Sequence, residues 1–378
     1  MTANSNQKNT RGNSSARKNS TKARETRKKT KIVVFAIEII IILLMVAALY
    51  IVMTKTNSNG PSYTTLEAED IIPDEVQAKK EEEGSTMQGY MNVALFGVDA
   101  STDSQLYKGS RSDSTMIASI NLDTGDIKLV SIYRDTYLNL SNDSYEKCNA
   151  AYSYGGAEQA VKMLNMNLDM DIENFVTVGY RGLSEVIDGL GGIYIEVDSA
   201  ELEHINNYQI SIANTLKCDY TPVTETGYQL LDGIQATAYC RIRYTAGDDF
   251  KRASRQREVI MAIEEQAKKA DLATLTKVFN SAVDDIYTSF SQEEILELLA
   301  NISNYTIVEE DGFPQESMRT VANIGAKGSC VIPQDLESNV IWLHQFLFED
   351  ESYEVTAAIL EYSDKIKSDT SKYIDKTY

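Results

Sequence analysis

One long apolar segment divides this chain of 378 residues into two parts that must fold in different surroundings. Residues 32–53 are apolar except for Glu38, and a helix of that length can cross a hydrocarbon layer of about 30 Å. A cleaved signal peptide is the alternative, but its apolar run is usually only about 7–15 residues long and ends at a small-residue site, which does not directly follow residue 53. We therefore expect a transmembrane helix at 32–53.

The charges on either side of this segment predict its orientation. Residues 1–31 contain ten Lys and Arg against one acid, Glu25, and almost no large apolar side chain, so we expect a disordered cytoplasmic tail. Of the 36 basic and 56 acidic residues in the chain, 26 basic and 54 acidic ones follow residue 53. We expect this acidic part to lie outside the cell membrane, and its charge disfavours nucleic-acid binding.

The cysteine and histidine content disfavours several kinds of site. The four Cys residues are widely spaced, fit no zinc pattern, and allow three disulfide pairings or none. His204 and His344 are the only histidines, and neither lies in a motif with a partner. A Ser-His-Asp hydrolase and a histidine-rich metal site are therefore disfavoured.

The rest of the chain is predicted to form a stalk followed by one α/β domain. Residues 54–88 contain Pro61, Pro73 and a charged run, which is typical of a spacer. Apolar periodicity predicts strands at 91–98, 115–121, 126–133, 175–178 and 193–197, and helices at 155–166, 183–190, 254–270, 272–280, 292–301 and 336–348. The turn 123–125 indicates a hairpin. This alternation predicts a domain at 89–350 with a mixed central sheet covered by helices, followed by an acidic C-terminal segment at 351–378.

Charged side chains lie next to several expected strands, at the edge where an open sheet usually forms its site. Asp99 ends the first strand and Asp113 precedes the second, and two such carboxylates can share a Mg²⁺ ion that completes its shell with water and phosphate oxygens. Arg134 and Asp135 follow the third strand, and Lys147 comes soon after. Each could instead cap a turn or form a surface ion pair worth under about 1 kcal/mol.

The stretch 241–256 concentrates arginines in an otherwise acidic region. If 239–244 is a strand, Arg241 and Arg243 point to the same face. If a helix begins near residue 254, Arg255 lies in its first turn, where the helix dipole disfavours a cation unless an anion is bound. Guanidinium groups bind phosphate bidentately, so a phosphate or pyrophosphate is the simplest ligand.

In this order, these segments resemble the LytR-CpsA-Psr family. The matching motifs are Phe96-Gly97-Val98-Asp99, Arg111-Ser112-Asp113, Ser131-Ile132-Tyr133-Arg134-Asp135-Thr136, 147–156, 186–193, 231–236 and the arginine-rich stretch. The resemblance implies an α/β/α sandwich with a lipid tunnel. It also implies a Gram-positive phosphotransferase that moves a glycopolymer, such as teichoic acid or capsule, from a polyprenyl-pyrophosphate carrier to the cell wall, typically to peptidoglycan.

The resemblance further implies roles for individual residues. Asp99 and Asp113 would hold Mg²⁺. The pyrophosphate would be held by Arg111, Arg134, Arg241 and Arg243. It would also be contacted, at the same mouth, by Arg252, Arg255, Gln256 and Lys147. The supporting residues or bases would be Asp135 and Asp249. The spacing of Arg252, Arg255 and Gln256 separately places them on one helical face. Three positions depart from the family pattern: Ser101 replaces a common arginine, Tyr133 the usual proline, and Arg181 a polar or acidic residue.

The expected reaction transfers a glycosyl phosphate from the lipid pyrophosphate to a sugar hydroxyl, with the lipid monophosphate as the leaving group. The apolar faces of 155–166 and 183–190 are candidate walls for the lipid tail. Two alternatives stay open at this point. One is a membrane-anchored regulator that binds polyprenyl pyrophosphate without turnover, and the other is a hydrolase that uses water as the acceptor.

Overall fold

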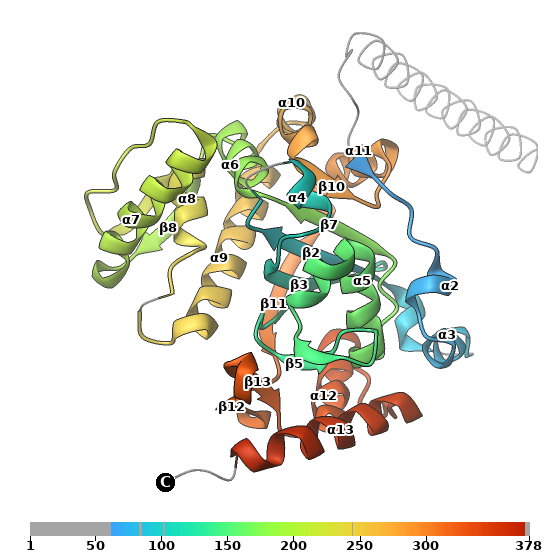
Figure 1. The fold of residues 1–378 in the computed structure, drawn as a ribbon. Helices are drawn as coiled ribbons and strands as arrows, with labels where there is room; N and C mark the ends of the chain where they lie inside the picture. Colours follow the sequence, from blue (N-terminus) through green and yellow to red (C-terminus); the bar gives the residue numbers. More distant parts are fainter. Residues whose placement is uncertain (1–61, 83–84, 101–102, 244, 375–378) are drawn as a thin grey trace, which may run out of the picture. The chain divides into compact units, whose positions relative to one another are not determined.

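The computed structural model describes residues 62–82, 85–100, 103–243 and 245–374 (Figure 1). The predicted cytoplasmic tail and transmembrane helix, residues 1–53, lie outside the described residues. Of the helices that are described, none is both long and apolar enough to cross a membrane.

A seven-stranded mixed sheet forms the centre, in the order β1-β10-β7-β2-β3-β4-β11. Its strands are β1 (Ser62–Tyr63), β2 (Tyr90–Val98), β3 (Ser112–Asn121), β4 (Asp126–Ile132), β7 (Asn174–Val178), β10 (Ile286–Thr288) and β11 (Thr306–Phe313). Neighbours β2, β3 and β4 are antiparallel, whereas β7 runs parallel to β2 and β11 parallel to β4. The Oδ1 atom of Asn121 accepts from two backbone N–H groups of the turn, which closes the expected hairpin. The predicted α/β class with a mixed sheet is confirmed.

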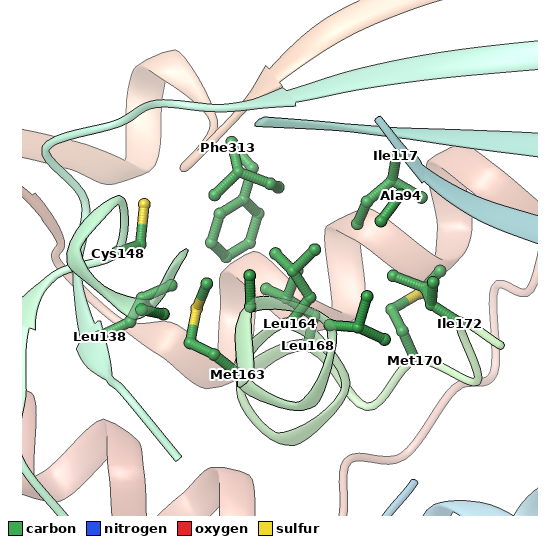
Figure 2. Packing of buried hydrophobic residues seen from close by; sticks show 14 of the residues in the cluster. Ala94, Ile117, Leu138, Cys148, Met163, Leu164, Leu168, Met170, Ile172 and Phe313 are labelled. Atoms are coloured by element: carbon green, nitrogen blue, oxygen red, sulfur yellow. The ribbon is translucent and has the colours of Figure 1, made fainter. Parts of the chain in front are cut away.

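One face of the sheet packs on α5 (Ala150–Leu168), α12 (Leu336–Phe348) and α13 (Ala357–Ile374). Because side chains alternate along a strand, Ala94 of β2 points into this core, as does Ile117 of β3. Figure 2 shows both facing Leu164 and Leu168 of α5, with Phe313 at the end of β11 beside them. This cluster is the largest apolar core of the described residues.

The opposite face carries a second set of elements. The helices α6 (Tyr180–Gly189), α7 (Ser199–Leu216), α8 (Gly233–Tyr239) and α9 (Asp248–Lys269) pack with the hairpin β8 (Ile193–Val197) and β9 (Gly227–Leu231) around their own apolar cluster. The helix α10 (Leu272–Ala282) packs on α6, and α11 (Gln292–Ala300) covers another part of this face. The site described below lies between the sheet and this second cluster.

Smaller elements complete the fold. These are α2 (Ala68–Ile71), α3 (Asp74–Glu81), α4 (Asp103–Tyr107), the pair β5 (Tyr137–Asn139) and β6 (Tyr145–Lys147), and the pair β12 (Arg319–Asn323) and β13 (Ser329–Pro333). The backbone N–H of Val331 in β13 donates to the carbonyl oxygen of Asp135 at 2.9 Å. This bond ties the C-terminal region to the residues that follow β4.

Both predicted boundaries of the domain need correction. The segment read as a stalk, 54–88, contributes α2 and α3, and Ile71, Ile72 and Val76 are buried in the main core. The C-terminal segment, 351–378, contains α13, whose Ile359 and Ile366 are buried in the same core. Both segments carry many charged residues, and only a few apolar residues at helical spacing pack inward. This small number of apolar residues made the two helical segments hard to predict as parts of the domain.

Two expectations about the arginine-rich stretch were also wrong. Residues 240–243 form a turn and an irregular segment after α8 instead of a strand. The helix α9 begins at Asp248, six residues earlier than expected, so its first turn holds Asp248 and Asp249, which suit the positive end of the helix dipole. No anion is therefore needed to offset arginines in the first turn of this helix.

Candidate active site

A cavity of about 340 Å³ lies between the sheet and the second cluster. Its floor is the sheet face opposite α5, where Leu95, Met116 and Val176 point. Its walls come from α6, through Leu183, and from α9, through Val259. The predicted helix 155–166, now part of α5, does not line this cavity, because its apolar face packs into the main core on the other side of the sheet.

The mouth of the cavity is polar and cationic. Arg241 and Arg243, in the loop between α8 and α9, line it together with Arg252 and Gln256 of α9 and Asp113 of β3. Although the loop is not a strand, both of its arginines face the same space. Arg252 and Gln256, four residues apart on α9, reach that space from one helical face.

Two aromatic rings hold Arg241. Its guanidinium carbon lies 4.7 Å from the ring centroid of Tyr180 on α6 and 5.2 Å from that of Tyr208 on α7. Both tyrosines line the cavity. Cation–π contacts of this kind fix the plane of a guanidinium while leaving its N–H groups available for an anion. Neither tyrosine could be predicted as a site residue, because nothing in the sequence marks an aromatic residue on a distant helix as a partner of Arg241.

Asp249 joins the other two arginines at the mouth. Arg243 donates from Nη2 to Oδ2 of Asp249 at 3.0 Å, and its Nε lies 3.0 Å from Oδ1. Arg252 lies 3.4 Å from the same oxygen, Oδ1, and donates from Nη2 to the backbone oxygen of Asp113 at 3.1 Å. Burial opposes the charge of Arg243, but Asp249, Asp135 and Asp113 together raise its pKa. Burial lowers the pKa of Arg252, which is only 5 % exposed, and the neighbouring carboxylates oppose that effect.

A second ion-pair chain runs from Asp113 to Lys147. Arg134 donates from Nη1 to Oδ1 of Asp113 at 2.7 Å, and its Nε lies 3.6 Å from Oδ1 of Asp135. Lys147, at the end of β6, lies 3.3 Å from the same oxygen of Asp135. A small pocket lined by Arg134, Asp135 and Asp249 adjoins the main cavity and shares Asp113, Arg252 and Gln256 with it. The structure therefore brings these predicted residues together at one place.

Asp99 and Asp113 lie at adjacent strand ends. Val98 of β2 pairs with Ser112 of β3 and Gly97 with Ser114, so Asp99 directly follows β2 and Asp113 is the unpaired residue at a register shift near the start of β3. Burial raises the pKa of the Tyr180 hydroxyl well above its usual value; Arg241 opposes this rise, and Asp99 and Asp113 add to it. Both carboxylates thus act on one hydroxyl at the mouth. Among the described residues, no group of three or more metal-binding side chains occurs.

Several predicted site residues do not line the cavity. Arg111, directly before β3, and Asp99, directly after β2, are both exposed and are not among the residues that line it. Arg255 is 1 % exposed, and its guanidinium is bound by Glu201, by the backbone oxygen of Ile242 and by Thr245. The expectation that Arg255 contacts the ligand is therefore corrected, because its donors are already used inside the protein.

Of the three unusual positions, two are described. Tyr133 is buried, its ring packs edge-on against Phe250 of α9 at 4.7 Å, and its hydroxyl accepts from Nη1 of Arg319 at 3.0 Å. The tyrosine also needs Gly312, because a Cβ there would lie 2.0 Å from its hydroxyl. Arg181 is half-exposed and lies 3.6 Å from Asp285, outside the cavity lining. Ser101 lies outside the described residues.

The four cysteines are free thiols, so of the alternatives left open by the sequence the structure shows the one without disulfides. Only Cys240 lines the cavity, and burial raises its pKa to about 12, so it is a neutral thiol at working pH.

As a whole, the site offers an apolar chamber that ends in guanidinium and carboxylate groups. Such a chamber can bind a molecule with a long apolar part and an anionic head.

Comparisons with known proteins agree on the family. A family model described as the LytR_cpsA_psr family matches residues 50–336. A polyisoprenyl-teichoic acid–peptidoglycan teichoic acid transferase, TagU of Enterococcus faecalis, is 27 % identical over 303 residues, which cover 77 % of this chain and 91 % of that protein. TagT of Bacillus subtilis, with the same transferase description, is 26 % identical and covers 72 % of this chain and 78 % of its own.

Solved structures share the fold. Protein gbs0355 of Streptococcus agalactiae superposes with a TM-score of 0.58 at 22 % identity, covering 75 % of this chain and 97 % of that one. A structure described as TagT bound to LI-WTA gives a TM-score of 0.52 at 21 % identity, covering 78 % and 95 %. With a family model that spans most of its length and relatives of the same architecture, this chain belongs to the LytR-CpsA-Psr family.

Proposed function

We propose that this chain is a membrane-anchored phosphotransferase that moves a teichoic-acid-type glycopolymer from a polyprenyl-pyrophosphate carrier to peptidoglycan. The observation that carries the proposal is the apolar cavity whose mouth gathers Arg241, Arg243 and Arg252. An apolar chamber suits a polyprenyl tail, and converging guanidinium groups suit a pyrophosphate. The names of the relatives supply the glycopolymer and the acceptor.

The same proposal includes the membrane anchor. Residues 32–53 would cross the cell membrane with the N-terminus in the cytoplasm, which places the described domain on the outer side of the membrane. A lipid-linked donor and a cell-wall acceptor would both be within reach there.

Asp99 and Asp113 fit a Mg²⁺ ion. They lie at adjacent strand ends, and Mg²⁺ commonly takes one or two carboxylates and fills its remaining positions with water and phosphate oxygens. Arg134 contacts one oxygen of Asp113, and a Mg²⁺ ligand needs only one oxygen from each carboxylate. When bound, the ion would offset negative charge on the pyrophosphate.

The residues of the chain then act by position and charge. The oxygen of an acceptor hydroxyl attacks the phosphorus that carries the sugar, the bond from that phosphorus to the bridging oxygen breaks, and polyprenyl monophosphate leaves. Arg241, Arg243 and Arg252 stabilise the charge that builds up on the phosphate oxygens. The proton of the attacking hydroxyl passes to one of the two carboxylates in the cluster, Asp135 or Asp249.

The test uses the purified full-length chain in detergent, with a lipid-linked teichoic acid precursor and peptidoglycan. Arg241→Ala and Asp113→Ala should each abolish Mg²⁺-dependent transfer without unfolding the protein. Arg181→Ala is the matched control, since this arginine pairs with Asp285 outside the cavity, and it should transfer at the wild-type rate. Wild-type protein that releases the polymer into water would identify a hydrolase, and binding without turnover would identify a regulator. Full transfer by both alanine variants would refute the proposed site.

A further inference from the structure

The most buried charged pair in the second cluster lies beneath the cavity mouth. The side chain of Arg255 on α9 is 1 % exposed and that of Glu201 on α7 is 3 % exposed, and Nε of the arginine donates to Oε1 of the glutamate at 2.7 Å. Taking two charges out of water costs several kcal/mol per ion, and apolar residues often stabilise a fold equally well. A buried pair of this kind therefore calls for a reason other than stability.

Its further contacts indicate that reason. Nη1 of Arg255 donates to the backbone oxygen of Ile242 at 3.2 Å, and Nη2 donates to Oγ1 of Thr245 at 2.7 Å. Ile242 and Thr245 belong to the loop between α8 and α9, and Ile242 stands between Arg241 and Arg243. One guanidinium thus holds the loop that carries both arginines of the cavity mouth.

Glu201 extends this link to α7. Its Oε2 accepts from the backbone N–H of Asp198 at 2.9 Å and so completes the capping box at the start of α7, while its Oε1 holds Arg255. The same helix carries Tyr208, whose ring faces Arg241. The contacts therefore form a closed ring that runs from α7 through Glu201 and Arg255 to the loop, and from Arg241 of the loop back to α7.

We propose that Glu201 and Arg255 are positioning residues that set the place of Arg241 and Arg243 at the cavity mouth, and that neither touches the ligand. The proposal rests on the proposed function for its ligand, an apolar pyrophosphate. The other side-chain contacts of the loop are made at its arginines, by Asp249 and by two aromatic rings, and at the backbone oxygen of Cys240, by Gln256. Ile242 is the one fully buried side chain among the described residues 240–243 and 245–247, so the backbone between the two arginines depends on Arg255. A lysine at position 255 keeps the charge but cannot reach Glu201, Ile242 and Thr245 together, since an ammonium group lacks the planar fork of guanidinium.

The experiment measures binding of farnesyl pyrophosphate to the full chain in detergent by calorimetry, beside the kcat and KM of transfer. Arg255→Lys should weaken farnesyl pyrophosphate binding about tenfold or more. Thr245→Val changes only the loop end of the link and leaves the buried pair intact, and it should weaken binding severalfold in a folded protein.

Arg257→Lys is the matched control. Arg257 lies one position beyond Gln256 on the same helix, is 6 % exposed, and pairs with Glu310 and with Ser131 instead of the loop. It should lower thermal stability as Arg255→Lys does, while the Kd for farnesyl pyrophosphate stays within about twofold of wild type.

Equal weakening in the Arg255 and Arg257 variants, or wild-type affinity in a folded Thr245→Val variant, would overturn the proposal. Because binding is measured apart from transfer, wild-type protein that binds the probe without transferring a polymer counts against the proposed function alone.

Discussion

Replacing Gly233 with alanine should destabilise the domain, because at this residue the backbone of α8 packs directly on the backbone of α6. A Cβ at 233 would lie 2.2 Å from the backbone oxygen of Ser184 and 2.7 Å from its backbone carbon. The backbone of Gly233 is also held on both sides, since its N–H donates to Asp188 at 2.7 Å and its oxygen accepts from Ser184 Oγ at 3.2 Å.

The magnitude follows from that geometry. The two helices must separate by about 1 Å to admit the methyl group, and overpacking of this kind costs about 1–3 kcal/mol. Weakening the hydrogen bond to the Asp188 carboxylate adds about 1.5 kcal/mol. We therefore expect a loss of about 3 kcal/mol in the free energy of unfolding, or about 5 °C in Tm for a domain of this size.

The assay is thermal unfolding of the full chain, followed by the fluorescence of Trp342, the single tryptophan. Gly89→Ala is the control, because a Cβ at this glycine meets nothing within 4 Å and its φ is not positive, so the change should be neutral or slightly stabilising. A Gly233→Ala variant that unfolds at the wild-type temperature would show that the two helices are free to move apart, and the geometric reasoning would fail.

Three further outcomes are expected. Tyr208→Ala should raise the KM for the lipid-linked donor about tenfold by releasing one face of Arg241, as measured in the transfer assay, and Tyr208→Phe should restore it. Burial lowers the pKa of His344 to about 4, below its unfolded value near 6.5, so the unfolded state binds more protons between these pH values. Lowering the pH from 7 to 4 should then remove about 3 kcal/mol of stability in urea titrations, and His344→Gln should remove that part of the dependence. Chelation with EDTA should stop transfer and added Mg²⁺ should restore it; transfer that persists without the ion would rule out a metal role for Asp99 and Asp113.

Four strands of the central sheet and the charged residues at their ends could be predicted from the sequence, whereas the strand order and the strands β1, β10 and β11 could not. Residues 91–98 predicted β2 to within one residue at its start, and the positions of Asp113, Arg134 and Lys147 beside strands predicted a shared site. These predictions succeed because alternation along a strand and position at a strand end depend only on nearby residues.

Features that depend on residues far apart in the chain could not be predicted from the sequence. The role of Arg255 is decided by Glu201, 54 positions earlier in the chain, and no local pattern shows that pairing.

The helix α7 was not predicted, although Asp198 and Glu201 have the spacing of a capping box and Ile205 and Ile212 are separated by two turns. This helical pattern is present in the sequence, but the many polar residues of the segment obscure it.

The acidic side chains of the site explain how an apolar cavity can end in several arginines without unfolding the domain. Arg134, Arg243 and Arg252 each contact a carboxylate within 3.6 Å, and Asp113, Asp135 and Asp249 are divided among them. Removing one carboxylate from such a network costs more than its own ion pair, because the remaining guanidinium groups then repel each other in partly buried surroundings. Arg241 is the exception: its stabilising contacts in the site are two aromatic faces, which compete less with an incoming pyrophosphate than a carboxylate does. The carboxylates therefore offset the charge of three guanidinium groups and hold them in place, and the aromatic pair leaves the fourth ready to bind an anion.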